Sequence, residues 1–586
     1  MGLSRPGHHK GITRLDRAPA WGVPSGLTPM STSLDLSLLT RLDPATLAAA
    51  GDGSLLRELL NLLEQLITEN QAQREELQRL RDEINRLKGE QAKPTFKSKG
   101  PPPGATNYSS EAERRQPKTW QKGTKLDRIQ IDRVERRQVD PGTLPDDAVY
   151  KGIETITVQD LILRTDNVQF ELELWYSPAQ RRSYRAALPA GYEGEFGPGI
   201  KGLALELAYG ANVSVGKLLE VFRQADVKMS SGWLATFLSG APADLAAEAR
   251  AAEQAGLVAC CWGHSDTTGT PVGAQEWYCH VLGNPLFTAY HTLPTQDRLA
   301  VLAVLWGGEP LRYLWNASAN ASLDHYGLSA QARRFLSAVP RDQVLDEPTL
   351  TGLLDPVRPW VNLQQRTWFR EALALAAYRA QSDWPVIQTL LSDDAAQYRL
   401  LTDEHALCWI HEGRHVKKLI AHVPLHQELL AQFRQDFWDF YRELNTYRAQ
   451  PTPAEATRLA LRFDTLFSRT TGFALLDHRI ALTRDKKAGL LLVLQHPELP
   501  LHNNPAELAA RQRVRKRDVS FGPRSVAGAK AWDLFMTLAA TAHKLGVSFF
   551  AYLQDRLQQA GRIPPLPDLI RERAASLNLS ASWASA

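Results

Sequence analysis

The stretch that organises the chain is HNNPAELAARQRVRKRDVSFG at residues 502–522. A turn at 503–505, Asn-Asn-Pro, precedes a helical run, and Asn as the N-cap with Pro at the first helical position are the usual start signals. Glu507 then falls in the first turn, where the helix dipole favours a carboxylate. Five cations follow at once: Arg511, Arg513, Arg515, Lys516 and Arg517. This arrangement suits a place where a metal ion and a phosphodiester meet. The alternative is a solvated helix start with a basic tail.

Length and composition set the outer limits. The chain has 586 residues, enough for about three or four domains. Its 44% hydrophobic content allows substantial cores, and its net charge of +4 is unevenly spread. Four cysteines without a Cys-x-x-Cys pair indicate a reduced, cytosolic setting. We expect no secretion signal and no membrane partner, because no apolar run approaches the roughly 18 residues that span a bilayer.

A heptad repeat follows a first segment, 1–52, that we expect to be disordered. Eight of the ten seam positions between 56 and 87 are Leu or Ile, which predicts a dimerising coiled coil at 53–90. Asn70 at an a position typically fixes register and a two-stranded state. The alternative is an amphipathic helix packed on its own domain. The residues expected to form the dimer seam are Leu63, Leu66, Asn70, Leu77, Leu80, Ile84 and Leu87.

Three segments connect this helix to the central part of the chain. Residues 91–125 read as a flexible basic linker. Alternating apolar residues at 126–196 predict a small β domain of four or five strands. Helical segments at 197–255 have the lengths and turns of a helix-turn-helix, with Ser230, Ser231 and Trp233 offered to a DNA groove. Any small helical bundle would give the same pattern.

The remaining chain alternates between strands and helices. Residues 256–315 contain an apolar run that ends in Asp266, two more strands and a helix. In 385–422 a second apolar strand ends in Asp393, with Asp394 as the rival acidic residue and Asp403 as a third choice. The other predicted parts are a helical insertion at 316–384, another at 423–498, a catalytic and closing helix at 499–560 and a loosely ordered tail at 561–586.

Two motifs in these segments resemble a known family. Residues 503–507, Asn-Asn-Pro-Ala-Glu, the basic run and Ser-Phe-Gly at 520–522 resemble the C-terminal signature of transposases of the insertion sequence 66 family. The strand ending in Asp393 is followed by a pattern similar to that family's Cys-Trp-x-His: Tyr398, Cys408, Trp409, His411 and Arg414. The resemblance extends over about 56–557.

Three departures from the family pattern are visible. There is no cysteine between residues 1 and 259, so the zinc ribbon of many members is absent. The loop after Asp266 has its proline only at Pro271. Leu508 stands where the family usually has an arginine after the glutamate. We expect no zinc at Cys408 and His411 either, because two ligands without a second pair do not make a closed zinc site.

The resemblance implies a multidomain mixed α/β protein with a ribonuclease-H-like catalytic core, preceded by the coiled coil, the small β domain and the helix-turn-helix. It also implies an Asp-Asp-Glu site made of Asp266, Asp393 and Glu507. Three carboxylates repel one another, and hard oxygen ligands select Mg²⁺ or Mn²⁺. Two such ions, about 4 Å apart, would assist cleavage and transfer of a DNA strand.

The expected partners follow from this assignment. They are double-stranded DNA at element ends and target, a homodimer or higher oligomer, and an element-encoded accessory protein, in a bacterial cytoplasm near the nucleoid. The expected phosphate contacts are Arg511, Arg513, Arg515, Lys516, Arg517, His411 and Arg414. The alternatives are a decayed or non-enzymatic DNA-binding protein, and a metal-dependent nuclease without strand transfer.

Overall fold

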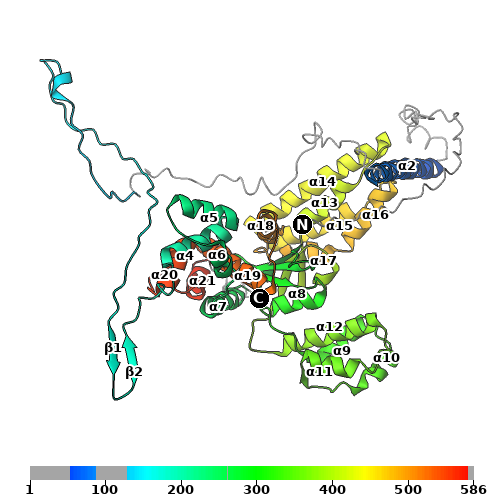
Figure 1. The fold of residues 1–586 in the computed structure, drawn as a ribbon. Coiled ribbons are helices and arrows are strands. Elements are labelled where there is room, and N and C mark those ends of the chain that lie inside the picture. The colour runs from blue at the N-terminus through cyan, green and yellow to red at the C-terminus, as the bar shows by residue number, and fades with distance from the viewer. Residues whose placement is uncertain (1–52, 88–128, 261, 578–586) are drawn as a thin grey trace, which may run out of the picture. The chain divides into compact units, whose positions relative to one another are not determined.

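The computed structural model describes residues 53–87, 129–260 and 262–577 (Figure 1). The predicted disordered segment 1–52, the basic linker 91–125 and the last nine residues lie outside this range. The described chain divides into two compact units, one made of residues 53–87, 420–431 and 472–474 and one of the rest. Each unit is described by itself.

The first unit contains the predicted heptad helix. Helix α2, Gly53–Leu87, is continuous over 35 residues. Its first turns pack on their own chain, because Leu56 and Leu60 are buried against Val423. From Leu66 onward the seam is uncovered within the described residues: Leu66, Leu77, Leu80, Ile84 and Leu87 are each at least 50% exposed. The predicted helix is therefore confirmed. Its first turns pack on their own chain, as the alternative of an amphipathic helix predicts, whereas pairing of the seam with a second copy stays a prediction.

A buried carboxylate ties this helix to the distant segment. Glu64 is 1% exposed and accepts hydrogen bonds from the backbone N–H groups of His422, at 2.5 Å, and Val423, at 3.0 Å. The His426 ring nitrogen Nδ1 lies 3.0 Å from the same carboxylate. These contacts satisfy backbone donors just before helix α14, Pro424–Ala449, begins.

In the second unit, the prediction of a small β domain at 126–196 is wrong. The described part contains a single hairpin, β1 (Leu174–Ser177) with β2 (Arg182–Arg185), and a short turn, η3 (Pro141–Thr143). The chain before the hairpin is extended, as Figure 1 shows, and its apolar side chains such as Ile156 and Leu161 are exposed. Alternation alone does not make a domain, because a hairpin needs further strands or a helix to cover its apolar face.

The helices expected at 197–255 are present. They are α4 (Pro198–Leu205), a π-helical turn η4 (Glu206–Gly210), α5 (Val215–Gln224), α6 (Ser231–Leu238) and α7 (Ala243–Ala259). The Ser230 hydroxyl accepts from the N–H of Trp233, which makes it the predicted cap of α6. Ser214 has the N-cap position of α5 without a side-chain hydrogen bond.

The core is a five-stranded mixed sheet in the order β5-β4-β3-β8-β9. Its strands are β3 (Trp262–Gly269), β4 (Tyr278–Gly283), β5 (Thr288–Leu293), β8 (Thr389–Ser392) and β9 (Glu404–Leu407). β4 is antiparallel to both β3 and β5, whereas β3, β8 and β9 are parallel. Asp266 therefore lies inside β3 rather than at its end, because α7 continues to Ala259 and the strand starts later than predicted.

Helices fill the first predicted insertion. After α8 (Arg298–Leu305) the chain forms α9 (Ala317–His325), α10 (Ala330–Phe335), η5 (Leu336–Ala338), α11 (Glu347–Leu354) and α12 (Leu363–Ala380). Two short strands, β6 (Tyr313–Leu314) and β7 (Val344–Leu345), pair between them. A short turn, η6 (Ala396–Tyr398), follows β8.

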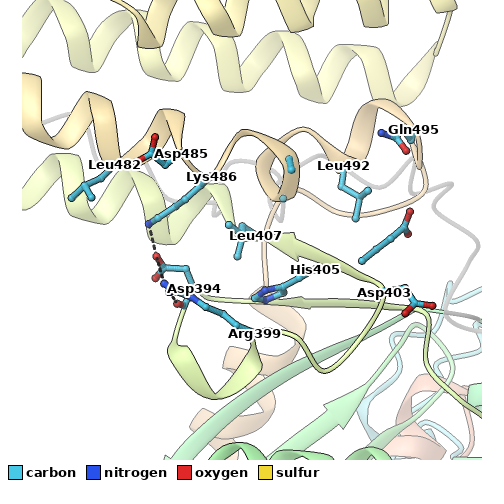
Figure 2. A pocket seen from close by; sticks show the side chains of 13 residues that line it. Asp394, Arg399, Asp403, His405, Leu407, Leu482, Asp485, Lys486, Leu492 and Gln495 are labelled. Atoms are coloured by element: carbon cyan, nitrogen blue, oxygen red, sulfur yellow. Dashed lines mark hydrogen bonds and ion pairs between the residues drawn. The ribbon is translucent and has the colours of Figure 1, made fainter. Parts of the chain in front are cut away.

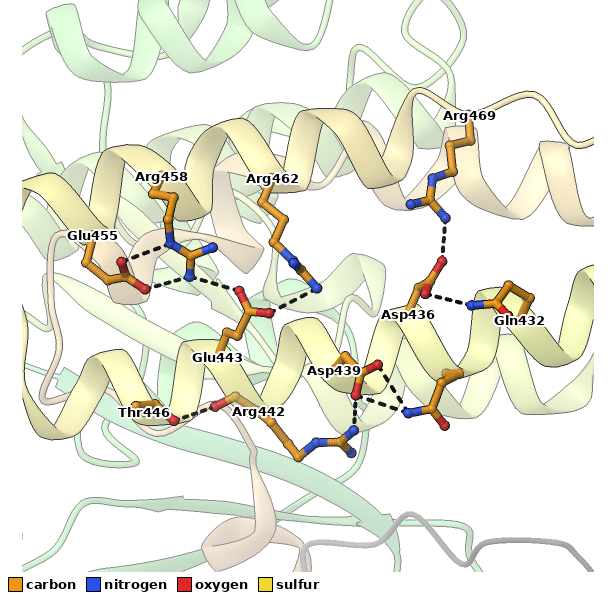
Figure 3. A network of polar contacts seen from close by, with 11 residues as sticks. Gln432, Asp436, Asp439, Arg442, Glu443, Thr446, Glu455, Arg458, Arg462 and Arg469 are labelled. Atoms are coloured by element: carbon orange, nitrogen blue, oxygen red, sulfur yellow. Dashed lines mark hydrogen bonds and ion pairs between the residues drawn. The ribbon is translucent and has the colours of Figure 1, made fainter.

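The second insertion follows α13, Trp409–Lys418, and begins with α14. It continues with α15 (Pro453–Phe467), α16 (Ala474–Arg484), α17 (Lys487–Leu490) and η7 (Leu492–Leu494). Aromatic rings pack beneath α14 and α15, with Trp409 against Phe437 and Phe463. On the surface, Arg458 and Arg462 of α15 both bind Glu443 of α14 (Figure 3).

Four helices close the chain: α18 (Asn504–Ser520), α19 (Val526–Lys544), α20 (Phe549–Gln558) and α21 (Leu566–Ser576). The last one corrects the predicted loose tail at 561–586, at least as far as residue 577. Leu566, Ile570 and Ala574 recur at helical spacing and are buried, so they give this segment an apolar face to pack.

None of the described helices is by itself long and apolar enough to cross a membrane. Together, α19 and α20 meet the length and composition criteria, but the pair is bent by 118°.

We expect Glu64→Ala to destabilise the docking of α2, because the buried N–H groups of His422 and Val423 would lose their acceptor at a cost of about 1–3 kcal/mol. Hydrogen exchange of the 420–426 amides should become faster in this variant. Glu69→Ala, which removes an exposed carboxylate of the same helix, is the matched control and should leave exchange unchanged. Equal protection in both variants would contradict the proposed role of Glu64.

Candidate active site

Strand register brings the first two acidic residues to the same level of the sheet. His264 of β3 is paired with Leu391 of the parallel strand β8. Asp266 lies two residues beyond the first (266 − 264 = 2) and Asp393 two residues beyond the second (393 − 391 = 2). Equal offsets from a paired position place Asp266 of β3 near Asp393, which directly follows the end of β8.

The electrostatics of Asp266 show that Glu507 belongs to the same cluster. Burial, together with the neighbouring charges of Glu507 and Asp393, raises the pKa of Asp266 to about 6. The Asp266 carboxylate accepts a hydrogen bond from the N–H of Thr267 at 2.9 Å, which acts in the opposite direction. The structure thus brings together the three acidic residues predicted from the sequence, although they are more than 100 residues apart along the chain.

Asn503 positions Glu507 relative to β3. Its side-chain amide, 1% exposed, donates to the Ser265 carbonyl at 2.7 Å, and its carbonyl accepts from the N–H of Glu507 at 3.1 Å. Its own N–H points to the Cys408 sulfur at 3.2 Å. The helix starts one residue earlier than predicted, with Asn503 instead of Asn504 at the N-cap, and the Asn503 amide links α18 to β3 instead of capping the helix. Sequence reasoning missed this role, because an asparagine that caps a helix and one that hydrogen-bonds to a distant strand have the same local sequence.

Two residues of α13 face Glu507. The Arg414 guanidinium donates to Glu507 Oε2 at 2.9 Å and, from its other terminal nitrogen, contacts His411 Nε2 at 3.0 Å. His411 Nδ1 lies 3.6 Å from Glu507 Oε1, too far for a hydrogen bond. Burial and the charge of Arg414 outweigh the nearby carboxylates and lower the pKa of His411.

The donor set of this cluster fits a divalent cation. Asp266, Asp393 and Glu507 come from three elements, their charges act on one another at Asp266, and Glu507 Oε1 is buried without a hydrogen-bond partner. Hard ions such as Mg²⁺ and Mn²⁺ prefer oxygen ligands of this kind. Cys408 Sγ, His411 and Glu507 also offer ligand atoms within 4.8 Å of one another. Burial raises the pKa of the Cys408 thiol to about 11, so it is protonated and a weak ligand near neutral pH.

The structure distinguishes Asp393 from Asp394 and Asp403, the two other candidates for the second acidic residue. Asp394 forms an ion pair with Lys486, which lowers its pKa although burial alone would raise it. Figure 2 shows this pair on the wall of a cavity of about 660 Å³ between β9 and α17. Asp403 lies on the same cavity, is largely exposed and pairs with Arg379. Of these three carboxylates, only Asp393 is among the charges that raise the pKa of Asp266.

Two predicted DNA contacts are wrong. Arg513 is fully buried, where it pairs with Asp533 at 3.1 Å and donates to Thr292. Lys516 is 3% exposed, donates to the Ala208 carbonyl and lies 4.3 Å from the centre of the Tyr209 ring. Burial lowers the pKa of Lys516 to about 7. Both residues continue the stripe of buried Ala506 and Ala510, so helical spacing could have identified them as core positions.

The other predicted contacts have mixed positions. Arg511 and Arg515 are exposed on α18, whereas Arg517 is half-buried and donates to the Gly269 carbonyl. Ser230 and Ser231 are exposed at the start of α6. Trp233 is half-buried and stacks on Phe237 instead of being free for a groove.

Further residues support α13 and β3. Glu412 is 3% exposed and accepts hydrogen bonds from Arg479 at 2.6 Å, Thr483 at 2.5 Å and Lys486 at 2.9 Å, which anchors the helix of His411 and Arg414. Sequence reasoning missed these contacts, because the partners lie 67 to 74 residues further along the chain.

A polar chain fixes the backbone next to Asp266. His280 Nε2 lies 3.0 Å from the Thr295 carbonyl, which can only accept, so this nitrogen carries the proton. Nδ1 then accepts from the Thr267 hydroxyl at 3.1 Å, and that hydroxyl accepts from Tyr398 at 2.8 Å. Burial lowers the pKa of His280 to about 4, so the ring is neutral in the folded protein at pH 7.

Comparison with known proteins agrees with these motifs. The profile of a family described as "Transposase IS66 family" matches residues 375–531, a range that contains Asp393, Arg414 and Glu507. A protein of Sinorhizobium fredii (strain NBRC 101917 / NGR234), described as "Uncharacterized protein y4jO", is 32% identical over 329 residues. The match covers 55% of this chain and 99% of the relative. The chain therefore belongs to the IS66 family of transposases. No solved structure matches it.

We expect Asn503→Ala to reduce the free energy of unfolding by about 1–3 kcal/mol, because the buried Ser265 carbonyl would lose its donor. Urea denaturation measures this change. His502→Ala, one residue earlier in the same turn, serves as the neighbouring comparison and should cost less. An Asn503→Ala protein as stable as the wild type would show that the amide does not hold α18 on β3.

We expect the protein to lose stability as the pH falls from 6.5 toward 4. The unfolded chain protonates His280 at its ordinary pKa of about 6.5, whereas the folded chain protonates it only near 4. The unfolded state therefore binds more protons in this range, and the contribution of His280 reaches up to about 3 kcal/mol. Thermal unfolding of His280→Gln should show a smaller loss over the same interval. The exposed His325, changed to Gln, is the control and should leave the wild-type dependence intact.

Proposed function

We propose that this protein is a DNA transposase that cuts at the ends of its element and joins the 3′-ends to target DNA. The observation that carries the proposal is the register of β3 with β8, which puts Asp266 and Asp393 at one level of the sheet, together with the effect of the Glu507 and Asp393 charges on Asp266. Its assignment to the IS66 family supports the same activity.

The topology of the sheet supports the ribonuclease-H-like core that the family resemblance implies. Three antiparallel strands precede a long helical excursion, and the chain returns to add two strands parallel to the first. An acidic residue on β3, another directly after β8 and a third on a later helix are what the Asp-Asp-Glu assignment requires.

In this proposal Asp266, Asp393 and Glu507 hold two Mg²⁺ or Mn²⁺ ions. These ions would supply an activated oxygen nucleophile and stabilise the charge on the leaving oxygen. Asn503 holds the start of α18, and so Glu507, against β3. The contact between Thr267 and Tyr398 holds the backbone next to Asp266 in place. Arg414, about half exposed beside Glu507, is placed to contact a DNA phosphate.

Binding of double-stranded DNA is assigned to cations that remain accessible. Arg511 and Arg515 are exposed on the helix of Glu507, and α5 with α6 forms the proposed helix-turn-helix. Such contacts give salt-dependent affinity that is largely independent of sequence. We also propose that the seam of α2 pairs with a second copy in a homodimer or higher oligomer, and that the protein acts in the bacterial cytoplasm, with or without an accessory protein.

Cleavage of DNA carrying the element's own end tests this proposal. With Mg²⁺ or Mn²⁺ the wild type should nick the end, and Glu507→Gln should reduce the rate by about a thousandfold, because metal stabilisation of the transition state amounts to several kcal/mol. Asp403→Asn removes an exposed carboxylate outside the cluster and should retain activity.

Three results would argue against strand transfer by this site. Equal cleavage by wild type and Glu507→Gln would show that Glu507 is not part of the catalytic site. DNA binding that is indifferent to Mg²⁺, with no cleavage by either protein, would favour a decayed enzyme or a non-enzymatic DNA-binding protein. Metal-dependent cutting without joining would identify a nuclease.

A further inference from the structure

Arg414 and Glu507 form an ion pair between α13 and the first turn of α18. Glu507 is mostly buried, with 17% of its side chain exposed, and one of its oxygens is bound by the guanidinium at 2.9 Å. The other oxygen faces His411 Nδ1 at 3.6 Å without a hydrogen bond. The carboxylate that would bind a metal ion thus already has a cation of the protein beside it.

The contact between Arg414 and His411 determines which ring nitrogen of His411 carries the proton. Arginine can only donate, so the 3.0 Å contact with Arg414 makes His411 Nε2 the acceptor and leaves the ring proton on Nδ1, toward Glu507. Arg414 therefore binds the carboxylate directly and also orients a second N–H group toward it. Both residues are on one face of α13, three residues apart, and Glu412 anchors this helix from its other side.

A divalent cation and the guanidinium compete for the same carboxylate, because Arg414 binds Glu507 Oε2 while Oε1 is left without a partner. Two positive groups a few ångströms apart repel each other, so a metal ion bound by Glu507 is held more weakly while Arg414 stays on the carboxylate and more tightly when Arg414 moves away. Arg414 is able to move, because 47% of its side chain is exposed. An exposed guanidinium beside the carboxylate cluster has an obvious new partner in a DNA phosphate, which it can bind with two parallel hydrogen bonds.

We propose that Arg414 couples metal binding to DNA binding by exchanging Glu507 for a backbone phosphate. This inference rests on the proposed function, in which Glu507 holds a metal ion. In the absence of DNA, Arg414 acts as the counter-ion of Glu507 and weakens metal binding. A phosphate that takes Arg414 frees the carboxylate, so DNA strengthens metal binding, and by thermodynamic linkage the metal strengthens DNA binding by the same factor.

The full-length protein, titrated with Mn²⁺ and followed by electron paramagnetic resonance of the free ion, tests the proposal with and without a DNA duplex. The wild type should bind Mn²⁺ about tenfold more tightly with DNA than without it. Arg414→Gln should bind Mn²⁺ about tenfold more tightly than the wild type in the absence of DNA, and the duplex should then add little. Arg414→Lys, which keeps the charge but not the paired donors, should fall between them.

Two comparison variants make the result specific. Arg379→Gln removes an arginine that pairs with the exposed Asp403 and should behave as the wild type. Asp266→Asn should weaken Mn²⁺ binding in every background, which shows that the ion is bound by the acidic cluster. Circular dichroism of each variant reports whether it is folded.

The outcomes distinguish the inference from the function on which it rests. Wild-type Mn²⁺ binding that depends on Asp266, with unchanged affinity in Arg414→Gln, would overturn the coupling but leave the metal site intact. Weaker Mn²⁺ binding by Arg414→Gln without DNA would also overturn it, because Arg414 would then support the site instead of competing for it. No Mn²⁺ binding by the wild type even with DNA would overturn both.

Discussion

Repulsion between three carboxylates is the constraint on which the site depends. Asp266, Asp393 and Glu507 come from β3, the end of β8 and the first turn of α18, and each would be more stable further from the others. The fold opposes this repulsion with rigid attachments: parallel pairing of β3 with β8 and the Asn503 amide on the Ser265 carbonyl. It also supplies a positive group, Arg414, directly at the carboxylate of Glu507.

Helix α18 shows how one segment serves two purposes. Its first turn carries Glu507, whereas its later turns bury Arg513 and Lys516 beneath α19 and beside Tyr209. These buried cations have carbonyl, carboxylate and aromatic partners, which is the condition for burying charge. A basic run in a sequence is therefore not by itself a DNA-binding surface. The spacing of each residue from the apolar stripe decides whether it faces solvent.

The sequence predicted most of the helices and the strands of the sheet, because periodicity is a local signal, and the roles of the three acidic residues stay a prediction. It placed Asp266 at a strand end, whereas the residue lies within β3, since element boundaries depend on packing that the sequence does not display. Alternation at 126–196 predicted a β domain, but the described chain holds one hairpin. Long-range contacts such as Asn503–Ser265 and Glu412–Arg479 have no local signature and could not be predicted.

The contact between α2 and residues 422–423 can form only late in synthesis. Glu64 and the backbone of His422, which it binds, are 358 residues apart. At synthesis rates of about 5–20 residues per second, roughly 20 to 70 s separate the emergence of these two residues from the ribosome. Throughout that interval Leu56 and Leu60 have no Val423 to cover them. The heptad helix of a nascent chain thus presents its whole apolar stripe until residue 423 has been made.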